Sequence, residues 1–201
     1  ATEDFRIHTN DGLADQGLGL VYKEVSSITD LPAKAFNDFR VKVKGDTELV
    51  QDDYYVKFQT KDGNDFGEGT WIEDVGYGVK VSINATTMPL QLKPDDATFN
   101  NWTLDTTTWG NRTAGDDDTN PAPTFVGSKI NDIFFFKNRL GLLTDSSIIF
   151  SEADEYFNFW RTTVLSLLDS APIDVGVSHT KVAILKHAVP FQEKLLIFSE
   201  G

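Results

Sequence analysis

Apolar and polar residues alternate along short stretches of this chain, and polar turns separate those stretches. The clearest alternation runs from Phe39 to Gly45, with Phe39, Val41 and Val43 on one face and three basic residues on the other. A period of two predicts a half-buried β-strand with a basic outer face. Two further strands are predicted at 54–58 and 69–73. The short polar loops between them favour a small antiparallel sheet joined by hairpins.

Strand-forming residues continue through the second half of the chain. Short apolar segments lie at 90–92, 102–104, 130–136, 180–185 and 194–198, and a strand pair around Asn138-Arg139-Leu140 is broken by the polar turn 144–147. Short strands at near-regular spacing predict a sandwich, a barrel or a propeller, and the spacing after Thr124 is that of a propeller blade. The segment 161–168 places Val164, Leu167 and Leu168 on one face and is predicted to form a short helix.

These patterns predict a mainly β fold: a small antiparallel sheet domain, then β-propeller-like strand modules, with few short helices. The division expected is a β-rich docking or sheet domain at 1–113, a linker at 114–123 and a propeller-like part at 124–201 that is truncated at its C-terminus. The linker is assigned because 114–123 holds three adjacent Asp, two Pro and no apolar residue larger than Ala. The first residue is not Met and the chain stops soon after a predicted strand, so we expect an internal fragment of a longer protein.

Composition narrows the possible functions. The 201 residues carry a formal net charge of −13 and no Cys, which excludes disulfides, Cys-ligated metals and a thiol nucleophile. No run of about 18 apolar residues is present, so no membrane-spanning segment is predicted. Tight binding to nucleic acid depends on clustered Lys and Arg and is disfavoured. An acidic wall past which DNA slides is compatible with this charge, and so is acidity that serves solubility alone.

No catalytic, cofactor-binding or metal-binding constellation emerges from the motifs. The chain has three histidines, His8, His179 and His187, and the pair 179/187 is eight residues apart, which matches no metal-site spacing, so structural roles are expected for both members of the pair. Carboxylates are so numerous that some pair across a cleft is expected by chance. A glycosidase needs two acids at a defined separation across a cleft, so the abundance of carboxylates is only a weak signal for a glycan hydrolase, which would be sought where acids adjoin a Trp. The positions to inspect are Glu73, Asp74, Glu152 and Asp154, near Trp71 or Trp160.

A series of short motifs, in order along the chain, carries a resemblance to a known family. They are Leu31-Pro32, Val43-Lys44-Gly45, 53–58, 71–73, 85–89, 119–123, 125–127, 138–141, 157–159, 169–174, 177–181 and 187–191. Each motif is weakly specific alone, but a dozen in this order over nearly the whole chain form a strong signal. The chain resembles the tail tubular protein B family, the nozzle proteins of short-tailed (podoviral) bacteriophages.

The resemblance implies a structural virion protein and not an enzyme. It implies a homo-hexameric nozzle at the distal end of the tail, with a β-propeller-like part, assembled in the bacterial host cytoplasm. The expected partners are the ring of tail tubular protein A (the adaptor or gatekeeper), the tail fibres, and the viral double-stranded DNA that passes at infection without tight binding. Two alternatives stay open: a tail-associated polysaccharide-degrading hydrolase, and a sugar-binding adhesin module with exposed Trp or Tyr faces.

Overall fold

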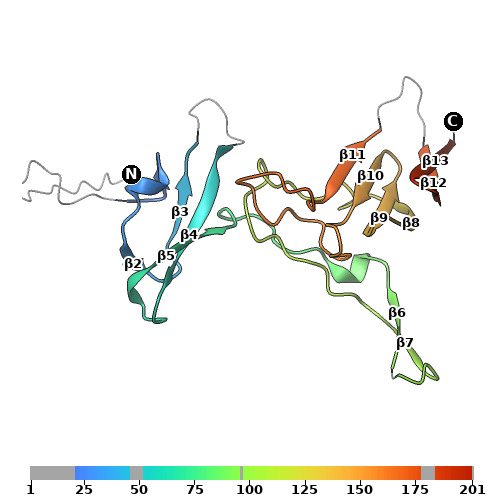
Figure 1. Ribbon diagram of the computed structural model, residues 1–201, viewed down its shortest axis with the longest axis horizontal. Coiled ribbons are helices and arrows are strands. Elements are labelled where there is room, and N and C mark those ends of the chain that lie inside the picture. Colours follow the sequence, from blue (N-terminus) through green and yellow to red (C-terminus); the bar gives the residue numbers. More distant parts are fainter. Residues whose placement is uncertain (1–20, 46–51, 96, 178–183, 201) are drawn as a thin grey trace, which may run out of the picture.

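The computed structural model describes residues 21–45, 52–95, 97–177 and 184–200. Regular structure in these residues is almost entirely β-strand, with two short 3-10 helices, so the predicted mainly β class is confirmed. Figure 1 shows two lobes, an N-terminal sheet and a C-terminal group of strands, with a separate hairpin that projects from the second lobe. No helix in the described ranges has the length and apolar character needed to cross a bilayer.

The N-terminal lobe is a five-stranded sheet. Its strands are β1 (Glu24–Val25), β2 (Lys34–Phe36), β3 (Arg40–Val43), β4 (Tyr54–Thr60) and β5 (Phe66–Asp74), with the 3-10 helix η1 (Ile28–Asp30) between β1 and β2. The order across the sheet is β1-β3-β4-β5-β2, and every pair is antiparallel except β1 with β3. The three strands predicted from alternation are therefore present as β3, β4 and β5.

The predicted inward face of β3 forms the core of this lobe. Val41 and Val43 are buried together with Val56 of β4, and Phe39 and Trp71 pack against them. The Trp71 ring lies edge-on to Phe58 at 5.0 Å, an arrangement that adds to the energy of burial alone. The alternation in the sequence of β3 therefore correctly predicted which side of the strand faces the core.

The second lobe is built around a four-stranded antiparallel meander. Its strands are β8 (Ile130–Phe136), β9 (Arg139–Thr144), β10 (Ser147–Phe150) and β11 (Ile173–Gly176), in the spatial order β11-β10-β9-β8. Lys137 and Asn138, which join β8 to β9, both have positive φ, the conformation of a type I′ turn that matches the twist of the flanking strands. Every residue of β9 is buried, which makes it the central strand of the lobe.

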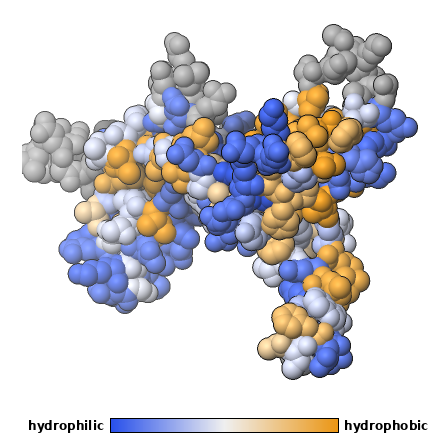
Figure 2. Space-filling model, turned by 45° about the vertical axis from the view of Figure 1, so that its right-hand side comes forward, coloured by the Kyte–Doolittle hydropathy of each residue, from blue (hydrophilic) through white to orange (hydrophobic). Residues whose placement is uncertain are grey.

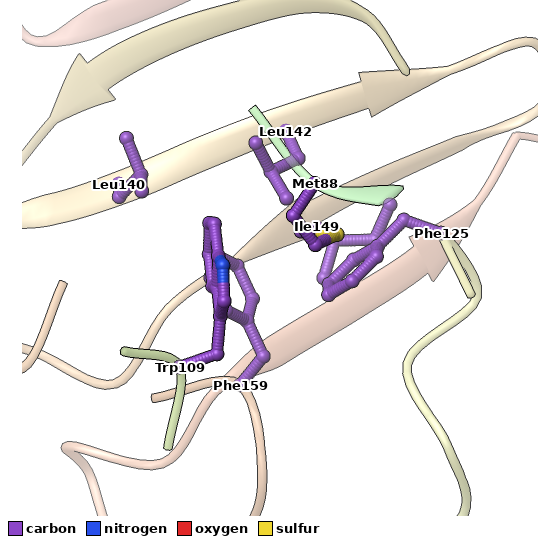
Figure 3. Packing of buried hydrophobic residues seen from close by; sticks show 7 residues of the cluster. All are labelled: Met88, Trp109, Phe125, Leu140, Leu142, Ile149 and Phe159. Atoms are coloured by element: carbon purple, nitrogen blue, oxygen red, sulfur yellow. The ribbon is translucent and has the colours of Figure 1, made fainter. Parts of the chain in front are cut away.

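Each face of the meander is covered by a different apolar cluster. On one face Leu140, Leu142 and Ile149 pack against side chains from loops (Figure 3): Met88, Trp109, Phe125 and Phe159. The other face presents Phe134 and Leu143 to the hairpin β12 (Ile184–Phe191) and β13 (Lys194–Glu200), which contributes Leu185 and Ala188. The strand predicted at 194–198 is present. Of the strand predicted at 180–185, residues 180–183 lie outside the described residues, and Ile184 and Leu185 belong to β12.

A second hairpin projects away from this lobe (Figure 1). It consists of β6 (Gln91–Pro94) and β7 (Trp102–Asp105) and follows the 3-10 helix η3 (Ala85–Thr87). The side chain of Asn84 caps η3 by accepting a hydrogen bond from the amide of Thr86. We call residues 90–105 the arm.

The helix predicted at 161–168 is wrong. This segment forms bends without helical hydrogen bonds, and Leu165, Leu167 and Leu168 are exposed. Amides that a helix would direct to its own carbonyls bind side chains instead: the amide of Val164 donates to Glu73 Oε1 at 2.7 Å, and that of Leu165 donates to Thr163 Oγ1. Such side-chain partners compete with helix formation.

The segment 114–123, for which a linker was expected, is largely packed into the fold. Ala114, Asp116, Thr119 and Asn120 are buried, with exposed fractions of 0 to 9%. The sequence argument missed this because burial here rests on hydrogen bonding and not on apolar side chains. The division into domains at 113 and 124 stays a prediction, although the segment itself is not an exposed connection.

Candidate functional site

The two lobes meet where β5 ends, and backbone contacts hold the meeting point together. The amide of Gly76 donates to the carbonyl of Gly115 at 2.8 Å, and the amide of Gly115 donates to the carbonyl of Asp74 at 3.2 Å. Gly115 has φ of +74° and sits against Thr119 and Val164, so a side chain there would be both strained and obstructed. We call residues 73–76 together with 114–120 the joint.

Ion pairs support the joint from the sheet side. Arg40 contacts Asp74 through two nitrogens at 2.7 and 2.8 Å, and Lys42 contacts Asp53 at 2.6 Å. The hydrogen bond to Asp53 raises the pKa of Lys42, against the lowering effect of burial. The basic outer face predicted for β3 is therefore largely neutralised within the molecule, which makes it a weak candidate for binding an acidic partner.

The acidic run at 116–118 forms a turn in which its first carboxylate is an internal acceptor. Oδ1 of Asp116 accepts hydrogen bonds from the amides of Asp118 and Thr119, each at 3.1 Å, and from the Thr119 hydroxyl. Burial alone raises the pKa of Asp116, but these donors stabilise the charged form and the net pKa is lowered. The carboxylate therefore has a structural role here.

Asn120 connects the joint to a distant part of the chain. Its amide nitrogen donates to the carbonyls of Ala114 and Arg161, both at 2.9 Å, and its oxygen accepts from the amide of Arg161 at 3.1 Å. The side chain is nearly fully buried and makes three bonds. Because it pairs with both backbone groups of Arg161, it mimics one rung of a β-ladder.

Arg139 likewise connects distant parts of the chain, in this case within the meander. Its guanidinium donates to the carbonyls of Ser151 and Ala171 at 2.7 Å each and to that of Asp169 at 2.9 Å. The planar fork of an arginine suits several acceptors at once. The side chain therefore fastens the loop between β10 and β11 to the start of β9, a role that the sequence did not reveal.

The acids named for a glycan hydrolase are mostly engaged in structural bonds. Glu73 binds the amide of Val164, Asp74 binds Arg40, and Glu152 accepts from Asn158 Nδ2 at 2.6 Å and from the Ser170 hydroxyl at 3.3 Å. Asp154 is exposed and has positive φ. Carboxylates held in this way are poorly placed to exchange protons with a substrate.

The two tryptophans named with those acids also have structural surroundings. Trp71 donates its indole N–H to the carbonyl of Pro32 at 2.9 Å. Trp160 is buried, and its ring stacks with the guanidinium of Arg112 at 4.4 Å. Neither forms an open stacking platform for a sugar. Among the histidines, His187 lies 3.7 Å from Asp132, whereas His8 and His179 lie outside the described residues.

Comparison with known proteins assigns the chain to a family. The family model described as bacteriophage nozzle protein matches residues 1–201. The chain belongs to the bacteriophage nozzle protein family. It is 42% identical over 193 residues to the tail tubular protein gp12 of Escherichia phage T7, an alignment that covers 96% of this chain and 23% of that relative. The nozzle-family chain thus spans about a quarter of the length of the curated relative it matches.

Family membership agrees with what the resembling motifs do in the structure. Arg139 joins motif 138–141 to motif 169–174, and Asn120 joins motif 119–123 to Arg161. Phe125 and Phe159, from two further motifs, meet edge-on at 5.1 Å in the meander core. In this nozzle-family chain, these five motifs make internal contacts that hold the second lobe together.

Proposed function

We propose that the chain is a structural part of a phage tail nozzle, forming part of the conduit for DNA ejection and a docking surface for tail fibres and the adaptor ring. The observation that carries this proposal is the match of the nozzle family model to all 201 residues. The T7 relative, which is named as a tail tubular protein, supports placement in the distal tail of the virion. Assembly in the host cytoplasm and a homo-hexameric ring belong to the same proposal.

The second lobe supports a propeller-like organisation. A four-stranded antiparallel meander is the usual form of one propeller blade. The hairpin β12–β13 packs face to face on the meander through Leu185 and Ala188, as the first strands of a following blade would. We therefore propose that this lobe contributes blades to a propeller.

A structural role also fits the charge of the chain. With a net charge of −13, a surface that faces the channel repels phosphate and does not retard the passing duplex. Glu73, Glu152 and Trp160, which were named as candidates for a hydrolase site, make contacts inside the molecule instead. We propose that the chain acts through assembly and not through catalysis.

Immunogold electron microscopy tests the proposal. Antibodies raised against the chain should label intact phage particles at the lower part of a short tail. Unlabelled particles, with the protein present in the lysate, would contradict it. A duplex-DNA titration at low and high salt is a second test, because a salt-sensitive submicromolar affinity would be incompatible with free passage.

A further inference from the structure

The arm carries an apolar face that its own lobe does not cover. Leu92 pairs with Leu104 and Pro94 with Trp102, and residues in such positions lie on the same face of a hairpin. Lys93 and Thr103 occupy the other face. Five apolar side chains of the arm are each at least half exposed: Leu90, Leu92, Phe99, Trp102 and Leu104. Figure 2 shows apolar residues along this projection.

Such an arm is poorly suited to stand alone in water. A two-stranded hairpin without further packing is at best marginally stable. Contiguous exposed apolar patches of several hundred Å² usually mark a site of interaction. At 150–250 Å² for an aromatic side chain, the five half-exposed residues amount to roughly 500 Å² of apolar surface. The arm therefore has the size of an interaction element.

A complementary surface lies beside the base of the arm. A groove of about 310 Å³ is bordered by Leu90 and Leu92, floored by Leu140 and Leu142, and flanked by Ile133 and Phe135 of β8. Ile133 and Phe135 are 46% and 57% exposed, and β8 is an edge strand of the meander. Within the described part of the chain, the residues that line the groove are all uncharged.

We propose that the arm of one copy lies in the groove of the neighbouring copy. This inference rests on the homo-oligomeric ring proposed above and specifies its contact. Two copies that each carry a charge of −13 repel one another, and the uncharged arm face and groove let them meet without opposing carboxylates. A head-to-tail contact of this kind uses one arm and one groove per copy, and it forms a closed ring where the rotation between neighbouring copies closes.

The available area fits a stable contact between copies. The arm face provides roughly 500 Å² and the exposed parts of Ile133 and Phe135 add roughly 200 Å², which makes roughly 700 Å² of apolar surface. The apolar share of an interface at the lower end of the standard size, about 57% of some 1,200 Å², is also roughly 700 Å². The two surfaces together are therefore large enough for subunits to associate.

Cross-linking between singly substituted proteins tests the contact, since the parent has no Cys. Full chains carrying Leu104→Cys are mixed with full chains carrying Ile133→Cys and treated with a short thiol-to-thiol cross-linker. Any mixed product joins two copies. We expect a linked dimer with Leu104→Cys and at least tenfold less with Thr103→Cys, the matched control on the opposite face of the arm.

A second variant keeps the test independent of cross-linker geometry. Leu92→Asp with Leu104→Asp should weaken self-association at least tenfold in sedimentation while leaving the circular dichroism unchanged. Oligomers that persist in this variant, or that form no link through position 104, overturn the arm contact and leave the ring proposal intact. A parent chain that stays monomeric at high concentration overturns the arm contact, which lies wholly within this chain, and leaves the ring proposal, which concerns the longer protein, intact. In assembled tails, a link from position 104 to a different polypeptide, or to another segment of its own chain, also overturns the contact.

Discussion

Gly141 lies at the centre of the meander, and replacing it with alanine tests the packing of β9. A Cβ on Gly141 would have three ring atoms of Phe134 as its nearest neighbours, all less than 3.0 Å away, whereas carbon atoms in contact prefer 3.5–4.0 Å. Phe134 cannot easily move aside because it is 6% exposed and its ring lies edge-on to Phe150 at 5.6 Å. Overpacking of this kind costs about 1–3 kcal/mol.

The control for this substitution is in the same sheet. Among the described residues, no atom lies within 4 Å of a Cβ position on Gly176 in β11, so Gly176→Ala should be neutral or stabilise by up to about 1 kcal/mol through the unfolded chain. Urea unfolding followed by tryptophan fluorescence and circular dichroism gives both free energies. A difference between the two variants below about 0.5 kcal/mol, the scale of ordinary surface substitutions, would refute the argument from packing.

A companion substitution identifies the obstructing side chain. Phe134→Leu removes the ring atoms that meet the new methyl group, although it destabilises the core by itself. If the ring is the obstacle, adding Gly141→Ala to Phe134→Leu should cost at least about 1 kcal/mol less than adding it to the parent, a coupling usual for residues in contact. Equal costs in both backgrounds would place the strain elsewhere.

Three further outcomes follow from the buried polar groups. Arg139→Lys should destabilise by about 2–4 kcal/mol in urea unfolding, because the compact ammonium of lysine does not reproduce the planar fork whose separate nitrogens reach the three carbonyls. A loss below about 1 kcal/mol would contradict the role given to the Arg139 guanidinium. Asn120→Ala should destabilise by about 2–4 kcal/mol, whereas the exposed Asp118→Ala nearby should stay within about 1 kcal/mol. The pKa of Asp116 is lowered in the folded chain, so its carboxylate stabilises the fold at pH values above the ordinary pKa of 3.8, and this stabilisation is lost as the pH falls through the folded pKa. Asp116→Asn should therefore flatten the fall in the free energy of unfolding below pH 3.8. An unchanged acid unfolding curve for that variant would show that its carboxylate is not linked to folding.

The strands could be predicted from the sequence because the pattern that indicates a strand depends only on residues close together in the chain. Alternation in β3 gives its inward face directly, the apolar run at 130–136 indicates a strand, and both strands are present. The polar turn 144–147 correctly separated β9 from β10, since turn chemistry is also local. The mainly β class could therefore be predicted with no knowledge of which strands pair.

The buried polar connections could not be predicted, because they depend on partners far away in the chain. Asn120 meets Arg161 across 41 positions and Arg139 meets Ala171 across 32. An Asp- and Pro-rich stretch has the composition of a linker, and only these partners make it an interior segment. The predicted helix at 161–168 failed for the same reason, since Glu73 takes one of its amides from 91 positions away.

The joint determines how load passes between the lobes. Adjacent backbone hydrogen bonds at Asp74, Gly76 and Gly115 resist shear together, because the lobes cannot slide without breaking both at once. Arg40 fixes the side chain of Asp74 on one side, and Asn120 ties the other side to Arg161. The joint therefore connects the two lobes through two backbone hydrogen bonds and through side chains that are themselves held in place, and it is not a polar linker without partners.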